Sequence, residues 1–184
     1  MRAPAPAHPT APSHWPLRAG YAALVLAILL VHLLPVEFGL GGWVWPDLLL
    51  VVSCVWVVRR PGAIPVWAFA LTFLLADLLL QRPPGLWAAL AVIATEALRG
   101  RADDMREVVF SVECAYVALA ITGLYAGFAA IWYVLVPYAM PYGLLAMQWL
   151  LTCLAYPIAA LLGAALFGLS KRPASATDNR GAAA

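Results

Sequence analysis

The chain has 184 residues, of which 65% are hydrophobic and only 11% are charged, and its mean hydropathy is +0.88. These proportions exclude an ordinary soluble domain, which carries about twice that charged fraction to cover its surface. The formal net charge of +2 says little by itself, because the placement of basic residues matters more than their sum in a membrane protein.

The sequence predicts one membrane domain between two tails. Residues 1–16 are rich in Ala, Pro, His and Ser, offer nothing to bury, and are expected to form a disordered cytoplasmic tail. Residues 17–169 are predicted to be the transmembrane domain, and residues 170–184 a second disordered cytoplasmic tail. The first apolar run lacks a small-residue cleavage site, so we expect it to be a retained anchor.

Six apolar runs follow one another in this domain, and each ends at a charge, a proline or a glycine. They occupy residues 17–35, 44–58, 64–80, 86–98, 108–136 and 144–169. Every backbone amide in hydrocarbon must be satisfied within its own segment, so each run is predicted to be a helix. The expected fold class is therefore an all-α integral membrane protein, a bundle of about six transmembrane helices.

The second and fourth runs are short for membrane spans. They have about 15 and 13 residues, whereas a span normally needs about 17–25. Such helices must tilt little, thin the bilayer, or lie among other helices instead of facing lipid.

Basic residues segregate to one side if all six runs cross the membrane. Ten of the eleven fall there: Arg2, Arg18, Arg59, Arg60, Arg99, Arg101, Arg106, Lys171, Arg172 and Arg180. Only Arg82 lies in a loop on the other side. The positive-inside rule then places both termini in the cytoplasm.

Aromatic residues are expected to form two belts at the membrane surfaces, where amphipathic rings favour the headgroup level. The predicted outer belt contains Trp43, Trp45, Trp87, Trp132, Tyr133, Tyr138, Tyr142 and Trp149, and the inner one Trp15, Trp56 and Trp67.

Two acidic residues lie near the predicted outer face, and an ionised Asp at mid-bilayer costs about 2.5–3.5 kcal/mol. Asp47 follows Pro46 at the start of the second run, where a carboxylate in the first turn meets the positive end of the helix dipole. Asp77 lies about one turn inside the outer end of the third run. It either forms an ion pair with Arg82 or makes a polar contact with another helix or a partner protein.

Two further acidic residues, Glu96 and Glu113, lie near the predicted cytoplasmic surface. The basic residues Arg99, Arg101 and Arg106 are close in sequence. We expect both glutamates to reach toward the surface and to pair locally with these arginines.

Small residues at four-residue spacing mark the last two runs. Gly123 and Gly127 form a GxxxG pair in the fifth run. The row in the sixth run consists of Ala155, Ala159 and Gly163. Such rows let helix backbones approach closely in a membrane, so they predict helix packing within the chain or with another protein. Pro157 is expected to kink the last helix.

Motifs for catalysis are missing from the sequence, which has no HExxH, no GxSxG and no Gly-rich phosphate loop. The longest predicted loop, residues 99–107, is too short to build a soluble active site. We expect no enzymatic activity. Two classes remain: a structural or scaffolding membrane subunit, and a substrate-binding transporter component.

Three stretches with a fixed order and spacing carry a resemblance to a known family. The second run reads PDLLLVVSCVWVVRRP, residues 46–61; the third contains LLADL, residues 74–78, followed by the turn PPGL, residues 83–86. The last run contains Tyr156-Pro157. Over about residues 17–169 the chain resembles the family of the rod shape-determining protein MreD. It departs from that family at the start of the turn, where Gln81-Arg82 replaces a small residue or glycine.

The resemblance implies a non-enzymatic, multi-pass subunit of the bacterial inner membrane, without cofactor, metal or nucleic-acid partner. Members of that family work with MreC, the actin-like MreB, RodA and an elongation-specific penicillin-binding protein in lateral peptidoglycan synthesis and cell shape. The family is also similar in topology to the substrate-binding (S-component) subunits of energy-coupling-factor vitamin transporters, which keeps the transporter class open.

Membrane lipids would surround such a subunit, and its contacts with partners or between helices would lie at a few positions. The candidates are Asp47, Asp77, Arg82, Gly123, Gly127, Tyr156, Pro157 and Gly163.

Overall fold

A computed structural model describes residues 15–33, 44–135, 141–167 and 169, and these residues form seven helices. The helices are α1 (Trp15–Leu33), α2 (Leu48–Arg59), α3 (Val66–Leu79), α4 (Leu86–Arg99), α5 (Asp104–Glu107), α6 (Phe110–Leu135) and α7 (Tyr142–Phe167). The predicted tails lie outside the described residues, except that α1 already begins at Trp15.

Six of these helices correspond to the six predicted runs, with ends that differ by at most four residues. The seventh, α5, is a single turn inside the predicted loop between the fourth and fifth runs. Helices α1, α6 and α7, with 19, 26 and 26 residues, are long and apolar enough to cross a membrane. The chain is therefore an all-helical, multi-pass membrane protein. Helices α2 and α3 are apolar but shorter.

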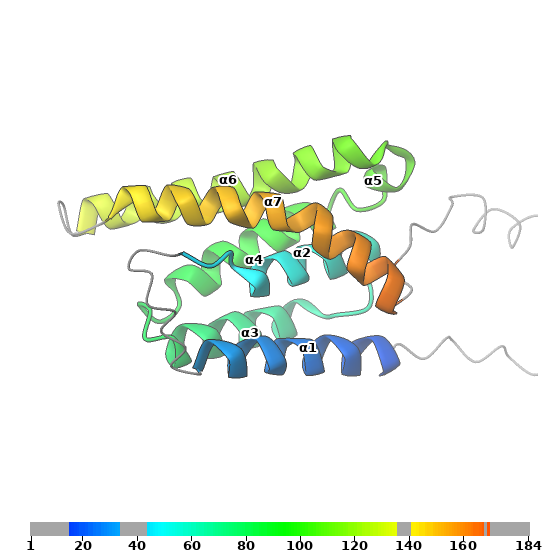
Figure 1. Cartoon of the computed structure of the whole chain (residues 1–184), viewed down its shortest axis with the longest axis horizontal. Helices are drawn as coiled ribbons and strands as arrows, with labels where there is room; N and C mark the ends of the chain where they lie inside the picture. Colours follow the sequence, from blue (N-terminus) through cyan, green and yellow to red (C-terminus); the bar gives the residue numbers. More distant parts are fainter. Residues whose placement is uncertain (1–14, 34–43, 136–140, 168, 170–184) are drawn as a thin grey trace, which may run out of the picture.

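The six helices α1, α2, α3, α4, α6 and α7 run in alternating directions along the chain, so the start of α1 and the end of α7 lie at the same end of the bundle (Figure 1). The loop between α2 and α3 lies at this end and is held by two arginines. Arg18 Nε donates to the carbonyl of Ala63 at 2.8 Å, and Arg99 Nη2 donates to that of Ile64 at 2.9 Å. We call this the basic end, and the opposite one the Arg82 end.

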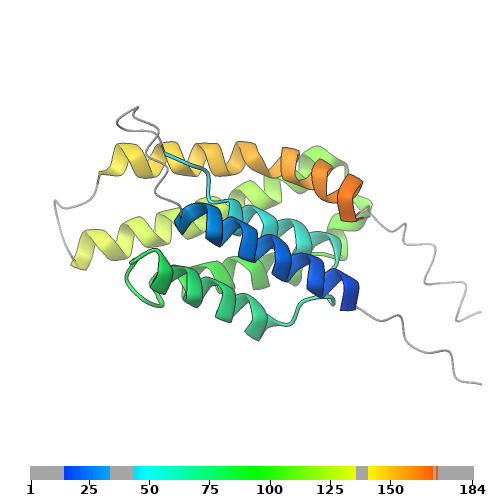
Figure 2. The same cartoon turned by 60° about the horizontal axis from the view of Figure 1, so that its bottom comes forward.

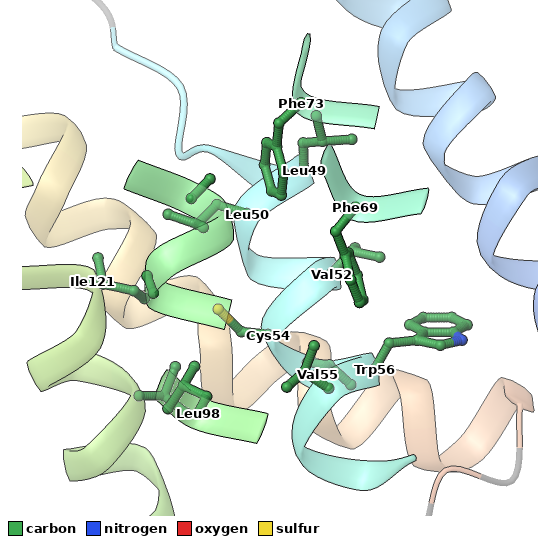
Figure 3. Packing of buried hydrophobic residues seen from close by; sticks show 14 of the residues in the cluster. Leu49, Leu50, Val52, Cys54, Val55, Trp56, Phe69, Phe73, Leu98 and Ile121 are labelled. Carbon is green, nitrogen blue, oxygen red and sulfur yellow. The ribbon is translucent and has the colours of Figure 1, made fainter. Parts of the chain in front are cut away.

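Helix α2 occupies the centre of the bundle (Figures 1 and 3). All ten residues from Leu49 to Val58 are buried, as expected for a helix that is apolar on every face. Its main neighbours are α7 and α4. At 1.5 Å per residue α2 is about 18 Å long, well short of a hydrocarbon core of about 30 Å. Of the options predicted for the short runs, α2 takes the one in which the helix lies among others.

Helix α4 is buried on one side only. Ala88, Ala91 and Ala94 face the bundle, whereas the side chain of Ile93 is 65% exposed. The small alanines let α4 pack closely between α3 and α6, its main neighbours.

Two of the predicted belt tryptophans are buried instead, and these predictions are wrong. Trp56 is 1% exposed because its ring packs against Tyr21 and Phe167, and Trp87 is 3% exposed because it packs against Tyr125 and Phe128. Of the predicted belt residues, Trp15, Trp45, Trp67, Tyr133 and Tyr142 are exposed, and Trp132 and Trp149 are half-buried. Trp43 and Tyr138 lie outside the described residues.

Helix α7 contains Pro157 and continues through it from Tyr142 to Phe167. It changes direction in its orange, C-terminal half, beyond the label in Figure 1. Proline has no N–H for the i−4 carbonyl, here that of Cys153, and a bend at this position is its usual consequence. The predicted kink agrees with this course of the helix.

Candidate functional site

Asp47 caps the N-terminus of the buried helix α2. Its Oδ1 accepts a hydrogen bond from the backbone N–H of Leu50 at 3.0 Å, and its own N–H donates to Thr152 Oγ1 on α7 at 3.0 Å. The sequence placed Asp47 inside the first turn, but the helix begins at Leu48 and Asp47 precedes it. Because α2 is too short to reach water at both ends, its free N–H groups need partners from the protein.

Arg82 pairs with Asp47 and not with Asp77, so the predicted Asp77–Arg82 ion pair is wrong. Arg82 Nη1 lies 3.4 Å from Asp47 Oδ2, and the guanidinium stacks over the ring of Trp87 at 5.0 Å. Among the described residues, Arg82 contacts Asp77 through the backbone, where Arg82 N–H donates to the Asp77 carbonyl at 3.0 Å.

Asp77 caps the next helix. Its side chain is fully buried, and Oδ2 accepts hydrogen bonds from the N–H groups of Gly85 and Ala88 at 3.0 and 3.1 Å. These groups belong to the first turn of α4, so the alternative prediction, a polar contact with another helix, is confirmed. The second oxygen, Oδ1, has no hydrogen-bond partner among the described residues.

The turn between α3 and α4 has two residues in the left-handed region of backbone conformation. Gly85 has φ +88°, and Gln81 has φ +53°. A side chain makes this conformation costly, by roughly 1–2 kcal/mol, which is why glycine suits it best.

The contacts of Asp47 extend to two further helices. Thr152 Oγ1, which accepts from Asp47 N–H, also lies 3.2 Å from the hydroxyl of Tyr125 on α6 and donates to the carbonyl of Gln148. We call Asp47, Asp77, Arg82, Tyr125 and Thr152 the outer cluster. The space between this cluster and His32 measures about 10 Å³, about enough for one water molecule.

A second cluster lies at the basic end and was not predicted. Arg59, at the end of α2, forms an ion pair with Glu113 of α6 at 3.0 Å, and the two side chains are 8% and 0% exposed. Tyr156 of α7 donates its hydroxyl proton to Glu113 Oε1 at 2.9 Å. The guanidinium of Arg59 also lies 5.8 Å from the ring centre of Phe110. We call Arg59, Glu113 and Tyr156 the inner cluster.

The prediction of local pairing holds for one glutamate only. Glu96 pairs with Arg99 three residues on at 3.1 Å, as expected. Glu113 instead pairs across the bundle with Arg59, because the first turn of α6 turns it inward. The position of Glu113 in the sequence could have indicated this pair. It lies three residues into a long apolar helix, and a carboxylate at that depth needs a polar or charged partner.

The three candidate glycines have different environments. A Cβ on Gly163 would lie 3.2 Å from Val55 of α2, so this glycine allows α7 to approach α2. A Cβ on Gly127 would lie 3.4 Å from Leu90 of α4, and one on Gly123 would meet nothing within 4 Å. The GxxxG pair therefore does not act as a unit: Gly127 faces the bundle and Gly123 faces outward.

The two clusters act as links between helices. The outer cluster joins α2, α6, α7 and the α3–α4 turn, and the inner cluster joins α2, α6 and α7. The predicted residues Asp47 and Arg82 are in direct contact, with Asp77 beside them, whereas Tyr156 lies in the inner cluster. The charged side chains of both clusters pair with other residues of this chain. Among the described residues no three of His, Cys, Asp and Glu lie close enough together to hold a metal ion.

Comparisons with known proteins give no relative for the chain: no family model, no curated protein and no solved structure matches it.

Proposed function

We propose that this protein is a non-enzymatic scaffold of the bacterial inner membrane, a subunit of the cell-elongation complex that binds an MreC-like membrane protein and supports lateral peptidoglycan synthesis. The resemblance to the MreD family suggests the partner. The observation that carries the proposal is that the charged side chains of both clusters hold this chain's own helices together. The surface left for other molecules is mostly apolar helix.

One strip of that surface suits a transmembrane helix of a partner. The α6 stripe consists of Val112, Tyr116, Leu119, Gly123 and Ala126, all of them exposed. Their spacing of four, three, four and three residues follows one side of a helix. The small residues at its C-terminal end, Gly123 and Ala126, would let a second backbone approach closely, which is the main source of affinity between helices in lipid.

The outer cluster favours a scaffold over a transporter subunit, because the space beside its polar groups is too small for a polar substrate, and the larger space between α1 and α3 is lined mostly by apolar side chains. A vitamin-sized ligand needs roughly 300 Å³ or more, whereas the space between His32, Asp47, Arg82 and Trp87 is about 10 Å³. The polar groups that could have converged on a substrate are hydrogen-bonded to one another instead.

The proposed topology has six spans with both termini in the cytoplasm. Reporter fusions after Gly41, Pro84 and Pro141 should then report the periplasm, and those after Pro61 and Ala102 the cytoplasm. The alternating helix directions and the arginines of the basic end support this arrangement. A cytoplasmic signal at Pro84 would contradict it.

Binding is tested by co-purification of the tagged chain with the MreC-like protein from the same membranes. The wild type should retain the partner, and Gly123→Leu should lower the retained amount at least about fivefold, because overpacking a close interface costs about 1–3 kcal/mol. The control is Gly143→Leu, since a Cβ there also meets nothing within 4 Å but lies outside the stripe. Equal losses from both variants would remove the α6 stripe from the interface.

The function itself is tested by depletion in a rod-shaped host. Cells that lack the protein should become rounded and wide while septal division continues. Depleted cells that stay rod-shaped and lose uptake of a vitamin would favour the energy-coupling-factor alternative and contradict the scaffold.

A further inference from the structure

An unfilled groove runs along the bundle between α1 and α3, which lie next to each other in Figure 2. Its volume is about 390 Å³, and its lining is mostly apolar, including Ala22 and Val25 of α1 and Ala68 and Leu71 of α3. That volume falls within the range of about 300–1,000 Å³ that small-ligand sites occupy. The groove is open along one side, where the bundle meets lipid.

The groove has the length of one membrane leaflet. It reaches from Arg18 to Leu29 along α1, about 16 Å, and from Pro65 to Leu75 along α3, about 15 Å. The hydrocarbon core is about 30 Å thick, so each distance is about half of it. A partner's transmembrane helix would need a groove across both leaflets and about 10 Å wide, whereas a single acyl chain fits one leaflet.

A positively charged side chain lies at the end of the groove nearest the membrane surface. Arg18 lines it at the basic end, together with Trp67, which is 70% exposed. Among the described residues, the carbonyl of Ala63 accepts from Nε of Arg18 at 2.8 Å, and a guanidinium carries five N–H donors in all. Tryptophan at this level is typical of the headgroup region. The apolar channel therefore ends at a positive charge at headgroup height.

We infer that this groove is a binding site for an anionic phospholipid, with one acyl chain between α1 and α3 and the phosphate beside Arg18. In the proposed orientation the lipid belongs to the cytoplasmic leaflet, whose surface potential is negative. The proposed scaffold function does not require this lipid site. Phosphate oxygens match the forked donors of arginine, and the chain fills the apolar part.

Quenching of Trp67 by brominated lipids tests the site in the full chain, reconstituted into phosphatidylcholine vesicles. The signal of Trp67 is the difference between the spectrum of the chain and that of Trp67→Phe. Brominated phosphatidylglycerol should quench it at an about fivefold lower mole fraction than brominated phosphatidylcholine. This ratio corresponds to about 1 kcal/mol for one basic residue near an anionic headgroup.

Matched variants separate the charge from the channel. Arg18→Gln should abolish the preference for phosphatidylglycerol and Arg18→Lys should keep most of it, whereas Arg101→Gln, at the same end of the bundle, should leave it unchanged. Ala22→Phe should fill the groove and reduce quenching by both lipids. The control is Ala23→Phe, which should leave quenching unchanged because Ala23 does not line the groove.

Three outcomes would overturn the inference. Equal quenching by the two lipids in the wild type would make the groove ordinary lipid-facing surface. A preference that survives Arg18→Gln would place the anion elsewhere. If Ala22→Phe abolished binding of the MreC-like protein, and that protein displaced the quencher, the groove would be a site for a partner helix.

Discussion

Replacing Glu113 by alanine will lower the free energy of unfolding by about 3–5 kcal/mol, the cost of leaving one charge of a buried pair without its partner. Arg59 is 8% exposed and cannot turn its charge to water without unpacking the end of α2. The hydroxyl of Tyr156 loses its acceptor in the same variant. The measurement is equilibrium unfolding in mixed micelles of a mild and a denaturing detergent.

The matched control is Glu96→Ala. Glu96 also pairs with an arginine, at 3.1 Å and at the same end of the bundle, but its side chain is 34% exposed. An exposed pair of this kind contributes at most about 1 kcal/mol, so this variant should be nearly as stable as the wild type. If Glu113→Ala were no worse than Glu96→Ala, the inner cluster would not be the buried link that its geometry indicates.

A triple variant separates stability from function. Arg59→Met, Glu113→Leu and Tyr156→Phe together remove the charges and the hydroxyl and replace them with apolar groups of similar volume. Replacing a whole buried pair in this way is often neutral or stabilising, so most of the lost free energy should return. A stable triple variant that fails to support rod shape would assign the inner cluster to function.

Asp77→Ala will be the most damaging change at the opposite end, with an expected loss of about 3–6 kcal/mol in the free energy of unfolding. Its oxygen Oδ2 accepts from two backbone N–H groups at the start of α4, and hydrogen bonds to a charged group contribute about 1.5–3 kcal/mol each. Asp77→Asn should lose less, because its amide oxygen can still accept from the same two groups. Unfolding in the same micelles gives both values.

Comparison with Arg82→Gln distinguishes a capping role of Asp77 from an Asp77–Arg82 ion pair. Arg82 pairs with Asp47 at 3.4 Å and is 27% exposed, so its loss should cost clearly less than that of Asp77. If the two residues instead formed one ion pair, Asp77→Asn and Arg82→Gln would be equally mild and the double variant little worse. Equal effects would therefore contradict the capping role of Asp77.

The caps and the short central helix are parts of one arrangement. A helix of about 18 Å inside a bilayer leaves its end groups in a medium where each unpaired backbone group costs several kcal/mol. Asp47 and Thr152 accept hydrogen bonds from backbone N–H groups at the start of α2, and Asp77 accepts them at the start of α4. Substitutions at these positions should therefore change stability first. Variants of the α6 stripe should change partner binding first.

The sequence by itself determined the helices. Runs of apolar residues ended by charge, proline or glycine predicted the six main helices to within four residues, because in lipid a backbone has few alternatives to a helix. The grouping of arginines at one end of the bundle also follows from the one-dimensional pattern. The number of long spans does not: six were predicted, and among the described helices α1, α6 and α7 are long and apolar enough to cross a membrane.

Only the tertiary structure decided which polar groups meet. Local spacing offered an ion pair with Arg82 as one of two alternatives for Asp77, and it predicted that Glu113 pairs with the arginines that precede it. In the structure Arg82 pairs with Asp47, 35 residues away along the chain, and Glu113 pairs with Arg59, 54 residues away. Trp56 and Trp87 likewise became core residues because the helices around them left room for their rings. In a membrane bundle every helix is apolar nearly all round, so hydrophobic periodicity gives little information on which face is buried. The direction of each polar side chain is fixed by packing between helices.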